Sequence, residues 1–137
     1  MNLNDCYEQG LLVKEAPSIE KAEKSIENAK LYLKQANDSF QAENYNLVIV
    51  CAYTSMFHAA RALLFKDGVR ERSHICLILY IKSKYQNLGE YAALIDSYRK
   101  SRHAAIYSLE YLITEIDAKE AINDGEMFLK EVEKIIK

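Results

Sequence analysis

The residues whose types could do chemistry gather in residues 98–107, which read YRKSRHAAIY. On a helix, Arg99 and His103 are four residues apart and so are His103 and Tyr107, so all three share one face. Nearby arginine side chains disfavour the cationic form of a histidine, so we expect the pattern to favour His103 as a neutral base. Arg102 and Lys100 add two more cations, and we expect Lys100 to face solvent. This stretch is therefore the first candidate site.

Such a group of side chains suits phosphate chemistry. His103 could remove the 2′-hydroxyl proton of RNA while Arg99 or Arg102 stabilises the charged phosphorane, and this reaction needs no metal. The alternative is that the stretch is a solvated basic helix face. The pattern alone does not decide between the two.

A second polar pair, His58 and Arg61, lies in a strongly apolar stretch. The two residues are three apart and share a helix face. A histidine and an arginine inside such a helix must meet a polar partner, water or another subunit. They could form a structural contact with a neighbouring helix, or they could face the same cleft as residues 98–107.

Other familiar sites are not indicated. His58, His74 and His103 fall on three different expected helices, and no histidine or cysteine pair has metal-ligand spacing. The sequence holds neither a phosphate-binding loop of the common kinds nor a GxSxG motif. We therefore expect no metal and no cofactor.

The composition bounds the fold class. The chain has 137 residues, which we read as a single domain spanning residues 1–137, and Pro17 and four glycines are its few helix breakers. We expect an all-α protein. No apolar run near 18 residues is evident and no signal peptide is visible, so we expect no membrane association. Cys6, Cys51 and Cys76 are scattered, which predicts reduced thiols and a cytoplasmic protein.

The charge is unevenly distributed. The net charge is −2, but residues 61–103 hold nine basic against four acidic residues, a local charge of +5. A basic middle in an acidic chain could bind phosphate or RNA, or it could be uneven solvated charge.

Apolar periodicity and capping residues predict the helices. Ser18 caps a helix that runs to about residue 42, and Asn44 caps a central helix that ends at Gly68. After a linker at 69–72, Ser73 caps a third helix over about 74–85. A fourth runs from about Glu90 to about Ile113, and the last covers about 118–136 with Asp117 as its cap. The prediction is an antiparallel bundle of four long helices plus a short N-terminal helical segment.

The run Ala52–Leu64 (AYTSMFHAARALL) resembles the second-helix signature of the HEPN family, the higher eukaryote and prokaryote nucleotide-binding domain. It continues into Gly68 and Ser73-His74, like the family's glycine and Thr/Ser-His at the start of the third helix. Arg102 and Tyr107 fall where the family often has arginine followed by Ala-Asp-Tyr. The resemblance covers about residues 19–135.

The resemblance implies a prokaryotic helical bundle that is commonly a homodimer. Family members often accompany a small nucleotidyltransferase as a toxin–antitoxin-like pair. Several are metal-independent ribonucleases in which four to six residues separate an arginine from a histidine on the penultimate long helix. Here Arg99 and His103 are separated by three residues, and Tyr107 stands where a histidine would follow Arg102.

Three hypotheses follow. The first is a domain that binds nucleotide or RNA through Arg102, Tyr107, Lys100, His58 and Arg61, and that acts as the weakly catalytic or non-catalytic partner of a nucleotidyltransferase. The second is a metal-independent endoribonuclease toxin that uses His103 with Arg99 and Arg102. The third is a structural dimerisation scaffold. The missing spacing places binding ahead of cleavage.

Overall fold

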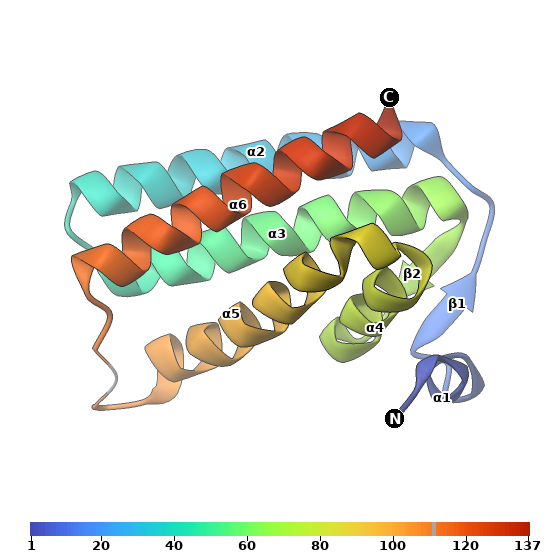
Figure 1. Cartoon of the computed structure of the whole chain (residues 1–137), viewed down its shortest axis with the longest axis horizontal. Coiled ribbons are helices and arrows are strands. Elements are labelled where there is room, and N and C mark those ends of the chain that lie inside the picture. Colours follow the sequence, from blue (N-terminus) through green and yellow to red (C-terminus); the bar gives the residue numbers. More distant parts are fainter. Residues whose placement is uncertain (111) are drawn as a thin grey trace.

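The computed structural model describes residues 1–110 and 112–137. Its four long helices are α2 (Ile19–Gln41), α3 (Tyr45–Asp67), α5 (Gly89–Tyr107) and α6 (Glu115–Ile136). They alternate in direction along the chain, and α3 contacts each of the other three (Figure 1). The short elements are α1 (Leu3–Glu8), β1 (Leu12–Lys14), β2 (Val69–Glu71), α4 (His74–Lys84) and the 3-10 turn η1 (Gln86–Leu88). The predicted all-α bundle is confirmed.

Helix α3 is the centre of the core. It is apolar on nearly all sides, and its fully buried side chains include Tyr53, Met56 and Leu63. With a mean hydropathy of 1.6 over its most apolar window, it is long and apolar enough to cross a membrane by length and composition alone, although the sequence showed no evident apolar run of that length. However, 67% of that window is buried inside the fold, which is the pattern of a core helix.

Local capping explains most helix ends. The side chains of Ser18, Asn44 and Ser73 accept backbone N–H bonds at the starts of α2, α3 and α4, as predicted. Gly68 ends α3 with φ +81°, a left-handed conformation that glycine adopts most readily. A Cβ on Gly68 would lie 2.5 Å from the carbonyl oxygen of Glu15, so this position has no room for a side chain.

Two predicted ends near residue 110 are wrong. Helix α5 ends at Tyr107, not near Ile113, and Ser108 is already extended. Leu109 and Leu112 are 102% and 81% exposed, so further helical turns would have no core to pack against. Helix α6 begins at Glu115 with Thr114 as its cap. Asp117, the predicted cap, instead closes a capping box by accepting the backbone N–H of Thr114.

The N-terminal segment holds a small sheet that the sequence prediction missed. Residues 69–72, expected to be a linker, include β2, which pairs antiparallel with β1 in the register Leu12 to Glu71, Val13 to Arg70 and Lys14 to Val69. Each strand has three residues, too few for a period-two pattern to be visible. The pairing attaches the N-terminus to the end of α3.

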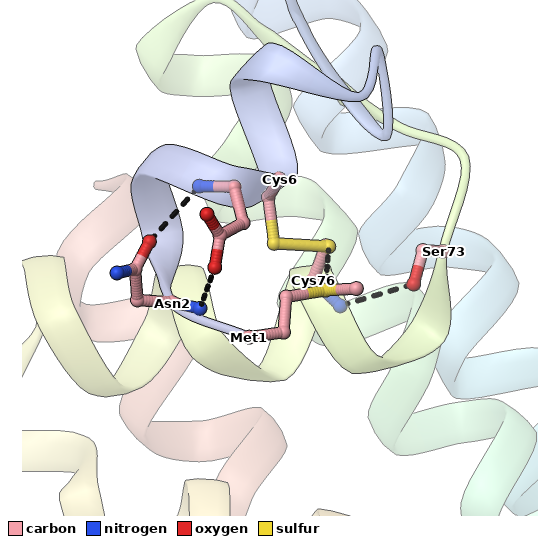
Figure 2. Close-up of a disulfide and its surroundings, with 6 residues drawn as sticks. Met1, Asn2, Cys6, Ser73 and Cys76 are labelled. Carbon is pink, nitrogen blue, oxygen red and sulfur yellow. Dashed lines mark hydrogen bonds between the residues drawn. A yellow bond between two sulfur atoms is a disulfide. The ribbon is translucent and has the colours of Figure 1, made fainter.

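A disulfide between Cys6 and Cys76 fastens α1 to the first turn of α4 (Figure 2). The prediction of three reduced thiols is therefore wrong for this pair, whereas Cys51 is free and buried. The two Cα atoms lie 5.8 Å apart, although 70 positions separate the residues in sequence. Such a separation leaves no local spacing by which the pair could be recognised.

Three further hydrogen bonds help to set the positions of α4 and α5, the helices that carry the candidate site. The hydroxyls of Tyr80 and Tyr85 both donate to Oδ2 of Asp67, at 2.9 and 2.7 Å, and so attach α4 to the end of α3. The hydroxyl of Tyr98 donates to Oδ2 of Asp124 at 2.6 Å and attaches α5 to α6. These bonds therefore anchor the end of α4 to α3 and anchor α5 to α6.

Candidate functional site

The basic stripe predicted on α5 exists, but its members differ in their surroundings. Nε of Arg99 lies 3.0 Å from Oδ1 of Asp96, in an ion pair within the helix. Nζ of Lys100 lies 3.5 Å from the other oxygen of Asp96, and its side chain is 70% exposed. The rings of His103 and Tyr107 are tilted, with centroids 4.8 Å apart, and both residues are exposed. The stripe therefore presents its end to solvent.

The stripe borders a pocket of about 250 Å³ between α4 and α5. Its lining residues are Ser73, His74 and Ile75 from the start of α4, together with Arg99, Arg102 and His103 from α5. The first backbone N–H groups of a helix carry partial positive charge. The start of α4 and the guanidinium groups of Arg99 and Arg102 therefore favour a negatively charged ligand in this pocket.

Arg102 is the least compensated charge in the pocket. Its Cζ lies 5.4 Å from the centroid of the Tyr53 ring, a cation–π contact. Its Nε is buried and has no hydrogen-bond partner among the described residues. Within the same part of the chain, no carboxylate forms an ion pair with Arg102, in contrast to Arg99. An anion in the pocket would supply the missing partner.

His74 is a pocket residue that the sequence analysis did not select as a site. Its Nδ1 lies 2.6 Å from the hydroxyl oxygen of Tyr53, and its ring stacks on Phe57 with centroids 4.2 Å apart. Burial, followed by the charge of Arg102, holds the pKa of His74 below its ordinary value. The signal in the sequence was the capping serine, since Ser73 places His74 in the first turn of a helix.

The pair His58 and Arg61 lies outside the lining of this pocket. The ring of His58 stacks on Tyr32, with centroids 5.3 Å apart and planes at 7°. Nε of Arg61 lies 2.8 Å from Oε1 of Glu71 and forms an ion pair with it. The geometry at Nε does not meet that of a hydrogen bond. Burial lowers the pKa of His58 and raises that of Glu71. These contacts join α3 to α2 and β2. They correspond to the first of the two possibilities for this pair, a structural contact with neighbouring elements.

Phe57 connects the two groups. Its ring stacks on His74 and meets His58 edge-on, with centroids 5.9 Å apart. Cζ of Arg61 lies 5.8 Å from the same ring centroid. The predicted pair therefore contacts the pocket through one aromatic ring, and does not enter it.

The arrangement suits anion binding. Two arginines and the start of α4 line the pocket, and all of them attract negative charge. Within residues 1–110 and 112–137, no group of three His, Cys, Asp or Glu side chains could hold a metal ion. Burial raises the pKa of Tyr53 to about 12, so its hydroxyl stays protonated at neutral pH. His103 has the position, next to both arginines, from which a base could act on a bound ligand.

Comparisons with known proteins find a matching family model and two relatives. A family model described as the HEPN domain matches residues 22–135, a range that includes every residue lining the pocket. "Putative toxin MJ0605" of Methanocaldococcus jannaschii is 28% identical over 116 residues, covering 82% of this chain and 86% of that protein. "Putative toxin MJ0142" of the same organism is 24% identical over 119 residues, covering 83% of this chain and 80% of that protein.

Proposed function

This chain belongs to the HEPN domain family, and from that premise we propose that it binds the phosphate of an RNA or nucleotide between α4 and α5 in a toxin-like role. The observation that carries the proposal is Arg102, a guanidinium with a buried Nε that lacks a partner among the described residues. Burying part of a charged group is costly unless an opposite charge meets it. A phosphate oxygen is a partner that a guanidinium binds well.

The surroundings favour the same ligand class. Arg99 and His103 line the pocket beside Arg102, and the N-terminus of α4 adds oriented N–H dipoles. Both relatives carry the word toxin in their names. A toxin that acts on RNA or on a nucleotide would need a phosphate site of this kind, so the pocket and the names support one proposal.

Binding is favoured over cleavage because Tyr107 stands where the family's motif would place a histidine after Arg102. Tyr107 is 69% exposed and does not line the pocket. With an ordinary pKa near 10, a tyrosine is a poor base at neutral pH. The second candidate, a metal-independent endoribonuclease, is supported by His103, which lines the pocket with both arginines.

We propose that the protein assembles through the end of α5 and the segment that follows. Exposed apolar side chains lie along this part of the chain and in the first turn of α6, namely Ile106, Tyr107, Leu109, Leu112 and Ile116. A second copy of this chain is the partner we propose, and a small nucleotidyltransferase is the other candidate. Light scattering should report a dimer for the wild type and a monomer for Leu109→Glu. A monomeric wild type at tens of micromolar would contradict the homodimer.

The binding test uses a short fluorescein-labelled single-stranded RNA in a salt titration. Arg102→Ala should weaken binding by about tenfold and reduce the salt slope by about one unit, since one phosphate contact is lost. Lys34→Ala is the matched control, because Lys34 is an exposed cation on α2 that pairs with Asp38. An unchanged affinity for Arg102→Ala would remove this pocket as the binding site.

The cleavage test uses the same RNA in the presence of EDTA. Cleavage by the wild type that His103→Ala abolishes would establish the endoribonuclease and overturn the binding-only proposal. If the protein neither cleaves RNA nor binds RNA or nucleotides in a salt-sensitive way, the structural scaffold is the remaining function.

A further inference from the structure

His74 lines the pocket but does not belong to the basic stripe of α5. The names of the two relatives assign it no role either. We propose that His74 is an uncharged N–H donor of the pocket, that Tyr53 fixes its tautomer, and that its Nε2–H binds an oxygen of the phosphate held by Arg102. The inference rests on the proposed function, from which it takes the phosphate. It adds a donor that the sequence motif on α5 does not contain.

The tautomer follows from the hydrogen bond between Tyr53 and His74. Tyr53 is 1% exposed, and Nδ1 of His74 is the partner recorded for its hydroxyl among the described residues. If Nδ1–H donated to the hydroxyl oxygen, the phenolic proton would be buried without an acceptor, which is costly. The hydroxyl therefore donates to Nδ1. In the neutral ring the proton is then on Nε2, which becomes the donor.

Two neighbouring aromatic rings hold the orientation of the imidazole. Its ring stacks on Phe57 at 4.2 Å with planes at 21°, and on Tyr53 at 5.8 Å with planes at 22°. Exchanging the two ring nitrogens would break the bond at Nδ1. Since Nδ1 is occupied by Tyr53 and the residue lines the pocket, Nε2 is the nitrogen that remains for a ligand.

The pocket also keeps the imidazole neutral. Burial is the main cause that lowers the pKa of His74, followed by the charges of Arg102 and Arg99 from α5 and, more weakly, Arg61 from α3. The nearby carboxylate of Asp96 is paired with Arg99. A cationic His74 would be repelled by these arginines. An uncharged N–H donor instead adds a directional hydrogen bond to the site without adding charge. Together with the guanidinium of Arg102, this donor matches the tetrahedral oxygens of a phosphate monoester or diester.

Substitutions at His74 separate a hydrogen-bond role from a packing role. Glutamine places an N–H donor near the position of Nε2, whereas asparagine reaches only to the position of Nδ1. Against the labelled RNA, His74→Ala and His74→Asn should each lose about tenfold in affinity, and His74→Gln should stay within about threefold of the wild type. The salt slope should be unchanged in all three, because no charge is removed. A His74→Gln variant as weak as His74→Ala overturns the inference.

The tautomer itself can be measured without any ligand. Long-range proton–nitrogen NMR of uniformly ¹⁵N-labelled full-length protein at neutral pH should show His74 with Nε2 protonated and Nδ1 unprotonated. Tyr53→Phe, which keeps the aromatic packing, should produce a mixture of the two tautomers and weaken RNA binding several-fold. A protonated Nδ1 in the wild type, or an unaltered tautomer in Tyr53→Phe, contradicts the role assigned to Tyr53.

The two proposals fail differently. If the wild type has no salt-sensitive affinity for the RNA, the proposed function fails and the phosphate half of this inference fails with it, whatever the NMR result. If Arg102→Ala weakens binding but His74→Ala does not, the proposed function stands and the role of His74 is overturned. Loss of affinity in both variants with retention in His74→Gln supports both.

Discussion

Reducing the disulfide should lower the stability of the protein by a large part of its total. Cys6 and Cys76 are 70 positions apart and both are fully buried. In the chain-entropy model a crosslink over such a loop removes about 15 cal/mol/K from the unfolded state, which is about 4 kcal/mol at 25 °C. Small domains have total stabilities of about 5–15 kcal/mol, so a loss of this size should be easily measured.

The reduced protein should nevertheless remain folded. The pairing of β1 with β2 also holds the N-terminal segment, and Leu12 at its start is buried in the core. Reduction therefore stabilises mainly the unfolded chain, and the native contacts of α1 persist. The expected result is a cooperative transition at lower denaturant concentration, with far-ultraviolet circular dichroism little changed before it.

The assay is urea denaturation with and without dithiothreitol, followed by circular dichroism. The Cys6→Ala, Cys76→Ala double variant is the control, and dithiothreitol should not shift its midpoint. Thiol titration of the unfolded, unreduced wild type should find one thiol, from Cys51. Three thiols, or an identical midpoint with and without reductant, would refute the reasoning.

Three other changes test the packing. Gly68→Ala should destabilise the protein by at least about 2 kcal/mol, because alanine disfavours φ +81° and its Cβ would meet the carbonyl oxygen of Glu15. Tyr98→Phe should cost about 1.5–3 kcal/mol by removing the hydrogen bond to Asp124. Both are measured by urea denaturation. His58 has its pKa lowered in the fold by burial, so the stability that it contributes is present above about pH 6.5 and is lost as the pH falls through the folded value. His58→Gln should therefore lose less stability between neutral pH and about pH 5.

Each of these changes has a control in the same chain. Gly10→Ala also places alanine at positive φ, but its Cβ would meet nothing within 4 Å, so it should cost less than Gly68→Ala. Tyr107→Phe, on the same helix as Tyr98 but exposed, should be nearly neutral. Equal costs in either pair would contradict the assigned contacts. A His58→Gln variant with the pH dependence of the wild type would contradict the third prediction.

The helices could be predicted because their signals are local. Periodic apolar positions and the capping residues Ser18, Asn44 and Ser73 act over one or two turns, and the structure confirms those ends. The start of α6 could not be settled in this way, because Thr114 and Asp117 are both good caps. Tertiary packing decides there, since Ile113 is buried while Leu112 is exposed. The strands and the disulfide join residues too distant in sequence for a pattern to indicate.

In the candidate site, too, only the features that depend on one helix could be predicted from the sequence. The stripe on α5 follows from spacing within one helix, so Arg99 and His103 could be placed together. The partners from other helices could not, because the contact between His74 and Tyr53 depends on how α4 is set against α3. The ion pair of Arg61 with Glu71 likewise required the strand that the sequence did not reveal.

The residues of α3 that carry the family resemblance do not line the pocket but contact side chains that do. Tyr53 and Phe57 are four residues apart on one face of α3, and their rings hold His74, while the ring of Tyr53 also lies under Arg102. Arg61, one turn further, contacts Phe57. A run of aromatic and basic residues in a core helix looks like packing when only the sequence is available. In the structure, that run contacts His74 and Arg102, the two side chains that carry the proposed phosphate binding. A change in the run should therefore alter affinity without touching the ligand.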